Sequence, residues 1–203
     1  MKKIISVIGA GGKTTLIHRL AEEYRRKGAS VLVSTTTHML VEPDTDLSCD
    51  SFAIMEKIKK TGYCMAGAVC PENSAKMQSL PEQMLHDLMK QVDYALIEAD
   101  GAKHYALKYP SEQEPVIPEG TTDVILVLGS WDLGKPCKDV VFRFEHMTSA
   151  LGISGDMKAD KQMLQWIWQA YEEKLKNMDY QGHFHVLLSE KTDQGLMFHT
   201  LEE

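Results

Sequence analysis

Short apolar runs alternate along the chain with segments in which apolar residues recur at helical spacing. The runs are rich in β-branched residues, as expected of strands buried on both faces of a sheet. They cover residues 4–8, 30–34, 94–97, 124–128 and 184–188, with a weaker run at 63–69. This alternation predicts an α/β fold in which a mostly parallel sheet has helices on both faces. The chain shows no internal repeat or second domain boundary, so we expect residues 1–203 to form a single domain.

The helical segments are predicted from the same pattern. The first follows the 4–8 strand, and Gly28 is placed to end it. Pro81 opens a second helix, because proline is favoured in the first turn. The longest helix runs from about residue 158 to 176 and carries an apolar stripe that we assign to core packing. Residues 42–50 are acidic and are expected to form a loop.

A glycine-rich loop joins the first strand to the first helix. Its sequence is Gly9-Ala10-Gly11-Gly12-Lys13-Thr14-Thr15. Glycines let backbone N–H groups turn toward an anion, and the helix N-terminus adds partial positive charge. We expect Lys13, solvent-accessible in the empty loop, to contact the β- and γ-phosphates and act in catalysis, and Thr14 to bind Mg²⁺. The loop therefore predicts a site for a nucleoside triphosphate, ATP or GTP, with Mg²⁺.

This loop departs from the usual spacing. Val7 stands where the pattern G-x-x-x-x-G-K-[ST] has its first glycine. The alternative is a glycine-rich strand-to-helix turn whose lysine is merely solvated. The strand before the loop and the helix after it favour phosphate binding.

Two carboxylates follow directly after the 94–97 strand, in the sequence Glu98-Ala99-Asp100-Gly101. A carboxylate at such a strand end can hold Mg²⁺ through a water, and a second can orient the attacking water. We assign Glu98 to the metal and Asp100 to the water or substrate, although the two roles could be exchanged. The alternative is an acidic strand end that stays solvated.

The composition of the chain limits the classes of partner that we expect it to bind. The 203 residues carry a net charge of −7 and no run of lysine and arginine, which argues against nucleic acid. No stretch approaches the length of a membrane span, and the first apolar run is too short for a signal peptide. We expect a cytoplasmic protein that binds neither nucleic acid nor membranes.

The four cysteines, at positions 49, 64, 70 and 137, form no C-x-x-C pair and no zinc spacing. We interpret them as small buried residues in a reducing compartment. The alternative is a redox-active or selenium-carrying thiol, for which Cys64 and Cys70 are the candidates.

Several motifs together resemble the YqeC family, known as selenium-dependent hydroxylase accessory proteins. They are the loop GAGGKTT, the threonines before His38, EADGAK at residues 98–103 and EPVIP at residues 114–118. The resemblance covers about residues 4–155. It implies a P-loop NTPase-like fold, as in MinD-like ATPases and dethiobiotin synthetase. It also implies a role in maturing molybdenum hydroxylases with a labile selenium ligand, so that such a hydroxylase or another maturation factor is the expected partner.

The chain departs from related P-loop proteins at three places. MinD-like ATPases carry an extra lysine early in the loop, and Ile8 stands there, so hydrolysis driven by that lysine across a dimer is not supported. A guanine-reading N-K-x-D motif is replaced by residues 190–193, EKTD, in which Lys191 and Asp193 are candidates for contacting the base. The chain ends ten residues after Asp193, and against the family its C-terminus looks truncated.

The segment from Ala102 to Gly120 is long for a loop in a compact domain, and such loops are usually functional or disordered. We expect it to form the wall of a second-substrate pocket at the carboxyl ends of the strands. The candidate substrate-contacting residues are Thr36, His38, Lys103, Lys108 and Glu114. The alternatives are a surface loop with scattered charges and, for His38, a structural hydrogen bond.

Two function classes remain open at this stage. The protein is either an enzyme that spends a nucleoside triphosphate or a nucleotide-dependent switch that binds an apo-hydroxylase. In the first class, it hydrolyses the nucleotide or transfers phosphate to a small acceptor, such as a pterin cofactor or a selenium compound. Glu98 and Asp100 beside a substrate-like loop favour the enzyme. The missing N-K-x-D motif and signature lysine leave the switch open.

Overall fold

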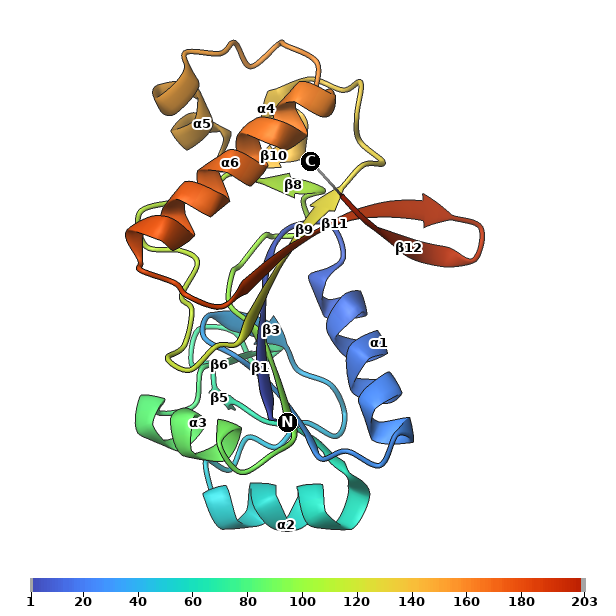
Figure 1. The fold of residues 1–203 in the computed structure, drawn as a ribbon, viewed down its shortest axis with the longest axis vertical. Helices are drawn as coiled ribbons and strands as arrows, with labels where there is room; N and C mark the ends of the chain where they lie inside the picture. The colour runs from blue at the N-terminus through green and yellow to red at the C-terminus, as the bar shows by residue number, and fades with distance from the viewer. Residues whose placement is uncertain (1, 202–203) are drawn as a thin grey trace. The chain divides into compact units, whose positions relative to one another are not determined.

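The computed structural model of the protein describes residues 2–201 (Figure 1). Its internal contacts divide the chain into two compact units. Unit 1 comprises the chain up to Val7 together with residues 14–101 and 116–123, and unit 2 comprises residues 8–13, 102–115 and the chain from residue 124 onward. The chain crosses between the units several times, and the single-domain expectation stays a prediction.

Unit 1 is built on four parallel strands. In sheet order they are β1 (Lys3–Gly9), β7 (Tyr94–Glu98), β2 (Val31–Thr35) and β4 (Tyr63–Met65), and the last two residues of β1 belong to unit 2. Leu96 of β7 pairs with Ile5 on one side and with Val33 on the other. The mostly parallel α/β sheet expected from the sequence is confirmed, including the pairing of the first strand with the 94–97 strand.

Helices cover both faces of this sheet, as predicted. They are α1 (Lys13–Arg26), α2 (Ser51–Thr61) and α3 (Glu82–Met89). Side chains alternate along a strand, so neighbours on β7 face opposite sides. Ala95 packs in a cluster with Ile58 of α2 and Leu88 of α3. On the other face, the Tyr94 ring stacks on Tyr24 of α1, with 3.7 Å between the ring centroids.

The α2 helix was not predicted from the pattern, although its ends follow ordinary capping chemistry. A carboxylate oxygen of Asp50 accepts hydrogen bonds from the backbone N–H groups of Phe52 and Ala53 at the start of the helix. Gly62 ends the helix in the left-handed conformation with φ 75°. The four-residue separation of its two buried residues, Ile54 and Ile58, is too little apolar pattern to indicate a helix.

A second, three-stranded antiparallel sheet also belongs to unit 1. Its strands are β3 (His38–Leu40), β6 (Lys76–Gln78) and β5 (Ala68–Val69), in that order. The expected strand at 63–69 is therefore two strands in different sheets, because Ala66 and Gly67 separate β4 from β5. This small sheet positions His38.

Unit 2 carries the remaining strands and helices. The strands are β8 (Leu107–Lys108), β9 (Asp123–Gly129, whose first residue belongs to unit 1), β10 (Val141–Phe142), β11 (His183–Thr192) and β12 (Gly195–Thr200). The helices are α4 (Cys137–Val140), α5 (Phe144–Leu151) and α6 (Lys161–Asn177). β11 and β12 form an antiparallel hairpin, and β8 pairs with β10 in parallel. The predicted late strand thus extends to Thr192, and the strand after it was not predicted.

The long α6 helix confirms the predicted packing face. Asp160 caps it by accepting a hydrogen bond from the backbone N–H of Met163. Met163, Ile167 and Tyr171 lie four residues apart on one face and are fully buried. Their stripe is part of the hydrophobic core of unit 2.

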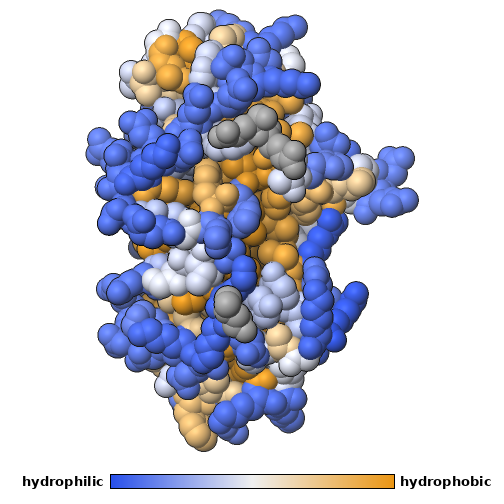
Figure 2. All heavy atoms as spheres, in the orientation of Figure 1, coloured by the Kyte–Doolittle hydropathy of each residue, from blue (hydrophilic) through white to orange (hydrophobic). Residues whose placement is uncertain are grey.

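The exposed face of α1 is polar. Figure 2 shows hydrophilic side chains along the outside of α1, where Arg19, Glu22 and Arg26 are exposed. No helix among residues 2–201 is both long enough and apolar enough to cross a membrane.

Candidate functional site

The glycine loop after β1 has a backbone that only glycine can adopt without strain. Gly9 and Gly11 have φ of 84° and 90°, in the left-handed region. A Cβ atom on Gly11 would lie 2.5 Å from the backbone nitrogen of Gly129 and 2.7 Å from the carbonyl oxygen of Ala106. A Cβ atom on Gly9 would clash with the carbonyl oxygen of Val127. The loop therefore passes too close to its neighbours in unit 2 for any side chain at these two positions.

Two hydrogen bonds fix the loop within unit 2. The backbone N–H of Ala10 donates to the carbonyl oxygen of Val127 at 2.9 Å, and the Ser189 hydroxyl donates to the carbonyl oxygen of Gly11. The next N–H groups open the α1 helix, where the first four N–H groups have no acceptor within the helix. Such groups can bind an anion, as the sequence predicts for Gly12 to Thr15.

Lys13 differs from the expectation in one respect. We expected a solvent-accessible lysine, but Lys13 is only 5% exposed. Its ammonium group folds back and donates a hydrogen bond of 2.8 Å to the carbonyl oxygen of Gly9. The carbonyl provides an acceptor that a pattern of residue types cannot reveal. The ammonium group is thus already held over the loop in which the phosphates are predicted to lie.

In unit 1, the structure brings together the two predicted metal ligands, Thr14 and Glu98. The Thr14 hydroxyl, in the first turn of α1, donates a 3.0 Å hydrogen bond to the carboxylate of Glu98 at the end of β7. Glu98 is 7% exposed. Oxygens on adjacent corners of an Mg²⁺ octahedron lie about 2.9 Å apart, given bonds of about 2.0–2.1 Å. The donor types and their spacing therefore fit Mg²⁺.

The carboxyl end of β2 braces this strand end. The Thr35 hydroxyl and the Thr36 backbone N–H both donate to the carbonyl oxygen of Glu98, at 2.8 and 3.1 Å. The Thr36 hydroxyl donates to the carbonyl oxygen of Val116 at 2.7 Å. Asp100, two residues beyond Glu98, is fully buried. Thr36 thus has structural partners, and its predicted contact with substrate stays a prediction, as does the role of Asp100.

The 102–115 segment of unit 2 contains a buried ion cluster. Lys108 is completely buried, and its ammonium group lies 2.7 Å from the carboxylate of Glu114. Arg143 lies 2.7 Å from the same carboxylate oxygen. Burial lowers the pKa of Lys108 to about 8 against the raising effect of Glu114, and the charges of Arg143 and Lys13 lower it further. Lys13 is therefore close enough for its charge to act on this cluster.

Three cationic side chains lie close to the ring of Phe142. The ammonium groups of Lys103 and Lys108 and the guanidinium group of Arg143 lie 5.4, 5.7 and 5.4 Å from the centre of its ring. Two of these three cations, Lys108 and Arg143, are also paired with the carboxylate of Glu114. Arg143 was not among the predicted site residues. It lies within the span of the family resemblance, about residues 4–155, but its residue type alone does not mark it as part of a site.

Three other predicted residues lie elsewhere. His38 begins β3 and is exposed, close to Cys70 and Glu72. Lys191 lies within β11, with its ammonium group 4.5 Å from the centre of the Trp131 ring, and Asp193 lies in the turn to β12. The residues predicted to read the base are therefore in a hairpin rather than after a last strand, and their role stays a prediction.

All four thiols are free. Cys64, Cys70 and Cys137 are buried, and Cys49 is partly buried. Burial raises the pKa of Cys64 to about 11, so that its thiol stays protonated at neutral pH. This argues against Cys64 as a reactive thiol and favours its interpretation as a small core residue.

Comparison with known proteins gives one family. The model of the YqeC protein family matches residues 5–145. The uncharacterized protein YqeC of Escherichia coli (strain K12) is 34% identical over an alignment 161 residues long, which covers 75% of this chain and 62% of that protein. Among solved structures, the crystal structure of FtsY from Mycoplasma mycoides covers 64% of this chain and 43% of its own, with 19% identity and a TM-score of 0.34. The chain spans 62% of the length of its curated relative.

Proposed function

The chain belongs to the YqeC family, and from this premise we propose that it binds a nucleoside triphosphate with Mg²⁺ and spends it during maturation of a selenium-dependent molybdenum hydroxylase. The observation that carries the proposal is the 3.0 Å contact between Thr14 and Glu98. Thr14 follows the glycine loop directly in the chain, so one oxygen of this pair is adjacent in sequence to the predicted phosphate loop.

Each part has a definite task in this proposal. Backbone N–H groups of the loop and the Lys13 ammonium group hold the phosphates. Thr14 and Glu98 hold Mg²⁺, which neutralises phosphate charge when it is bound. Asp100 accepts the proton of the water or acceptor hydroxyl that attacks the terminal phosphate. Burial of this carboxylate keeps competing solvent away from it.

The acceptor in this proposal carries an anionic group. Lys103, Lys108 and Arg143 bring three cations to Phe142, whereas Glu114 offers one carboxylate. This excess of positive charge suits a phosphate or carboxylate on the second ligand. A phosphorylated pterin or an anionic selenium compound has that chemistry. Arg143, with its planar donor fork, is the residue suited to contact it.

Native mass spectrometry with ATP, GTP and Mg²⁺ tests the nucleotide part of the proposal. We expect one nucleotide per chain, bound more tightly with Mg²⁺ than without it. Phosphate release, with and without an apo-hydroxylase, then separates an enzyme from a switch. Turnover that needs only a small acceptor supports the enzyme, and turnover that needs the hydroxylase supports the switch.

A further inference from the structure

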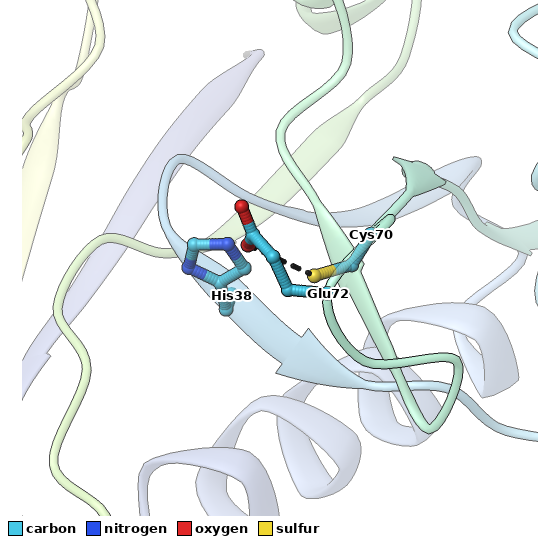
Figure 3. A group of neighbouring side chains, drawn as sticks. All are labelled: His38, Cys70 and Glu72. Carbon is cyan, nitrogen blue, oxygen red and sulfur yellow. Dashed lines mark hydrogen bonds between the residues drawn. The ribbon is translucent and has the colours of Figure 1, made fainter.

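Three side chains of unit 1 with different donor atoms meet beside the small antiparallel sheet. His38, Cys70 and Glu72 bring a nitrogen, a sulfur and an oxygen atom within 4.8 Å of one another. Figure 3 shows the three side chains converging, with His38 from β3 and the other two from the segment after β5. Cys70 is 3% exposed, whereas His38 and Glu72 are exposed. The sulfur is therefore fixed in the fold, while the other two donors can adjust.

The register of the small sheet places the histidine. His38 of β3 and Ala68 of β5 both pair with Gln78 of the central strand β6. They therefore occupy the same row across the sheet, although they are 30 positions apart in the chain. Cys70 follows Ala68 by two residues and is the first residue after the end of β5. The sheet thus brings together residues that show no local ligand spacing.

A turn places the glutamate. The backbone N–H of Asn73 donates to the carbonyl oxygen of Cys70 at 3.2 Å, which closes a β-turn over residues 70–73. Pro71 occupies the second position, where its fixed φ favours the turn. The turn folds Glu72 back over Cys70, so that a carboxylate oxygen lies 4.0 Å from the thiol sulfur.

The donor types also match a divalent cation in charge. A cysteine that binds a metal does so as the thiolate, and a glutamate does so as the carboxylate. An imidazole nitrogen of His38 would supply a third donor, which adds no negative charge. The set of donors therefore carries two negative charges, which match a divalent cation.

We propose that His38, Cys70 and Glu72 form a site for a divalent transition metal, and that Zn²⁺ is the ion it fits. Zn²⁺ takes sulfur, nitrogen and oxygen donors at about 2.0–2.3 Å in a tetrahedron, which puts donor atoms about 3.3–3.8 Å apart. The donor atoms lie within 4.8 Å of one another, so reaching these separations takes a movement of about 1.5 Å or less, which the exposed side chains of His38 and Glu72 can make.

The proposed site leaves one coordination position of the metal without a protein ligand. Three protein ligands leave the fourth position of a tetrahedron for water or a small ligand, as in catalytic zinc sites. Soft donors that enter this position, such as a thiolate or a selenide, suit a zinc ion already bound to sulfur. The proposal is independent of nucleotide binding, because none of these residues belongs to the glycine loop or the Thr14–Glu98 pair.

Cobalt and zinc titrations of the purified, chelator-treated protein test the proposal. We expect one Co²⁺ per chain, with thiolate-to-cobalt charge transfer and the visible bands of a tetrahedral ion, and displacement by Zn²⁺. Cys70→Ser should abolish the charge transfer, and His38→Gln and Glu72→Gln should each weaken binding by at least about tenfold. Cys49→Ser is the matched control and should leave the spectrum unchanged. Thermal melts establish that each variant is folded.

Three results would overturn this site. One is a protein that binds neither Co²⁺ nor Zn²⁺ above background. A second is equal binding by Cys70→Ser and Cys49→Ser. The third is a thiol at Cys70 that iodoacetamide alkylates rapidly in the metal-free protein and equally in the presence of Zn²⁺, which would indicate a nucleophile. Because Glu72→Gln changes an exposed residue, it keeps the test valid even if Cys70→Ser fails to fold.

Discussion

The hydroxyl of Thr14 and the carboxylate of Glu98 are separated by 84 positions in the chain and joined by a 3.0 Å hydrogen bond. The first follows the glycine loop and the second ends the β7 strand, which pairs with the strand that leads into the loop. Parallel neighbours end at the same edge of a sheet, and this is why the two oxygens meet. The proposed Mg²⁺ site follows from this topology.

Glu98→Gln should weaken the Mg²⁺-dependent part of nucleotide affinity by at least about tenfold, because a neutral amide cannot balance the charge of the ion. The amide still accepts the Thr14 hydrogen bond, so the fold should be retained. Isothermal titration of nucleotide with and without Mg²⁺ measures the effect. Glu22→Gln, an exposed acid on α1, is the control, and an equal loss in that variant would contradict the assignment.

Asp100→Asn should leave nucleotide binding nearly intact and lower turnover by about a hundredfold or more, as expected when a general base is lost. A phosphate-release assay beside the titration measures both. If Asp100→Asn loses Mg²⁺-dependent binding while Glu98→Gln keeps it, the two roles are exchanged. If neither variant changes binding or turnover, the pair is a structural strand end.

Gly11→Ala should destabilise the loop and impair nucleotide binding, because its Cβ atom would approach Gly129 to 2.5 Å at a φ of 90°. Gly134 is the matched control, because its φ is 89° and a Cβ atom added there would meet no other atom within 4 Å. Gly134→Ala carries only the backbone strain, about 1–2 kcal/mol. Urea unfolding should show a larger loss in the free energy of unfolding for Gly11→Ala than for Gly134→Ala. Equal losses would show that the close approach of Gly11 to Gly129 is unimportant.

Lys108 should make stability depend on pH. Its pKa of about 8 lies below the ordinary 10.5, so between these values the unfolded chain binds more protons than the folded chain. The free energy of unfolding therefore rises with pH in this window, and below pH 8 the dependence disappears.

Urea unfolding at about pH 7.5 and 9.5 measures this dependence. Over this interval, the free energy of unfolding of the wild type should rise by on the order of 1–2 kcal/mol relative to that of Lys108→Met, in which the titrating group is absent. Lys60→Met, at an exposed lysine of α2, should behave as the wild type does. A constant difference between wild type and Lys108→Met would show that Lys108 titrates normally.

The sequence predicts the parallel sheet and the glycine loop because both are local patterns. The 94–97 strand is a continuous apolar run, and the loop between β1 and α1 is a contiguous motif. Elements with a weak apolar pattern were missed. Among the described residues, the β12 strand is half-exposed and pairs with β11 at the edge of the sheet, so its composition carries little signal.

The candidate site also contains some residues that local sequence patterns identify and others that only the folded structure brings together. Lys13 and Glu98 could be identified from their places after strands, but the burial of Lys13 depends on the Gly9 carbonyl that it contacts. Arg143 reaches Glu114 through a left-handed backbone with φ 63°, a conformation that residue type does not indicate. The His38–Cys70–Glu72 group depends on the register of the small sheet and has no sequence motif.

The central claim is that the loop from Gly9 to Thr14 binds the phosphates of a nucleotide, and nucleotide titration of the Lys13→Met variant tests it most directly. Methionine keeps the volume of the buried side chain and removes the charge that contacts phosphate. We predict that the wild type binds ATP or GTP with Mg²⁺ and that Lys13→Met, folded by its thermal melt, loses at least about a hundredfold in affinity. Unchanged affinity in the folded variant would contradict the account.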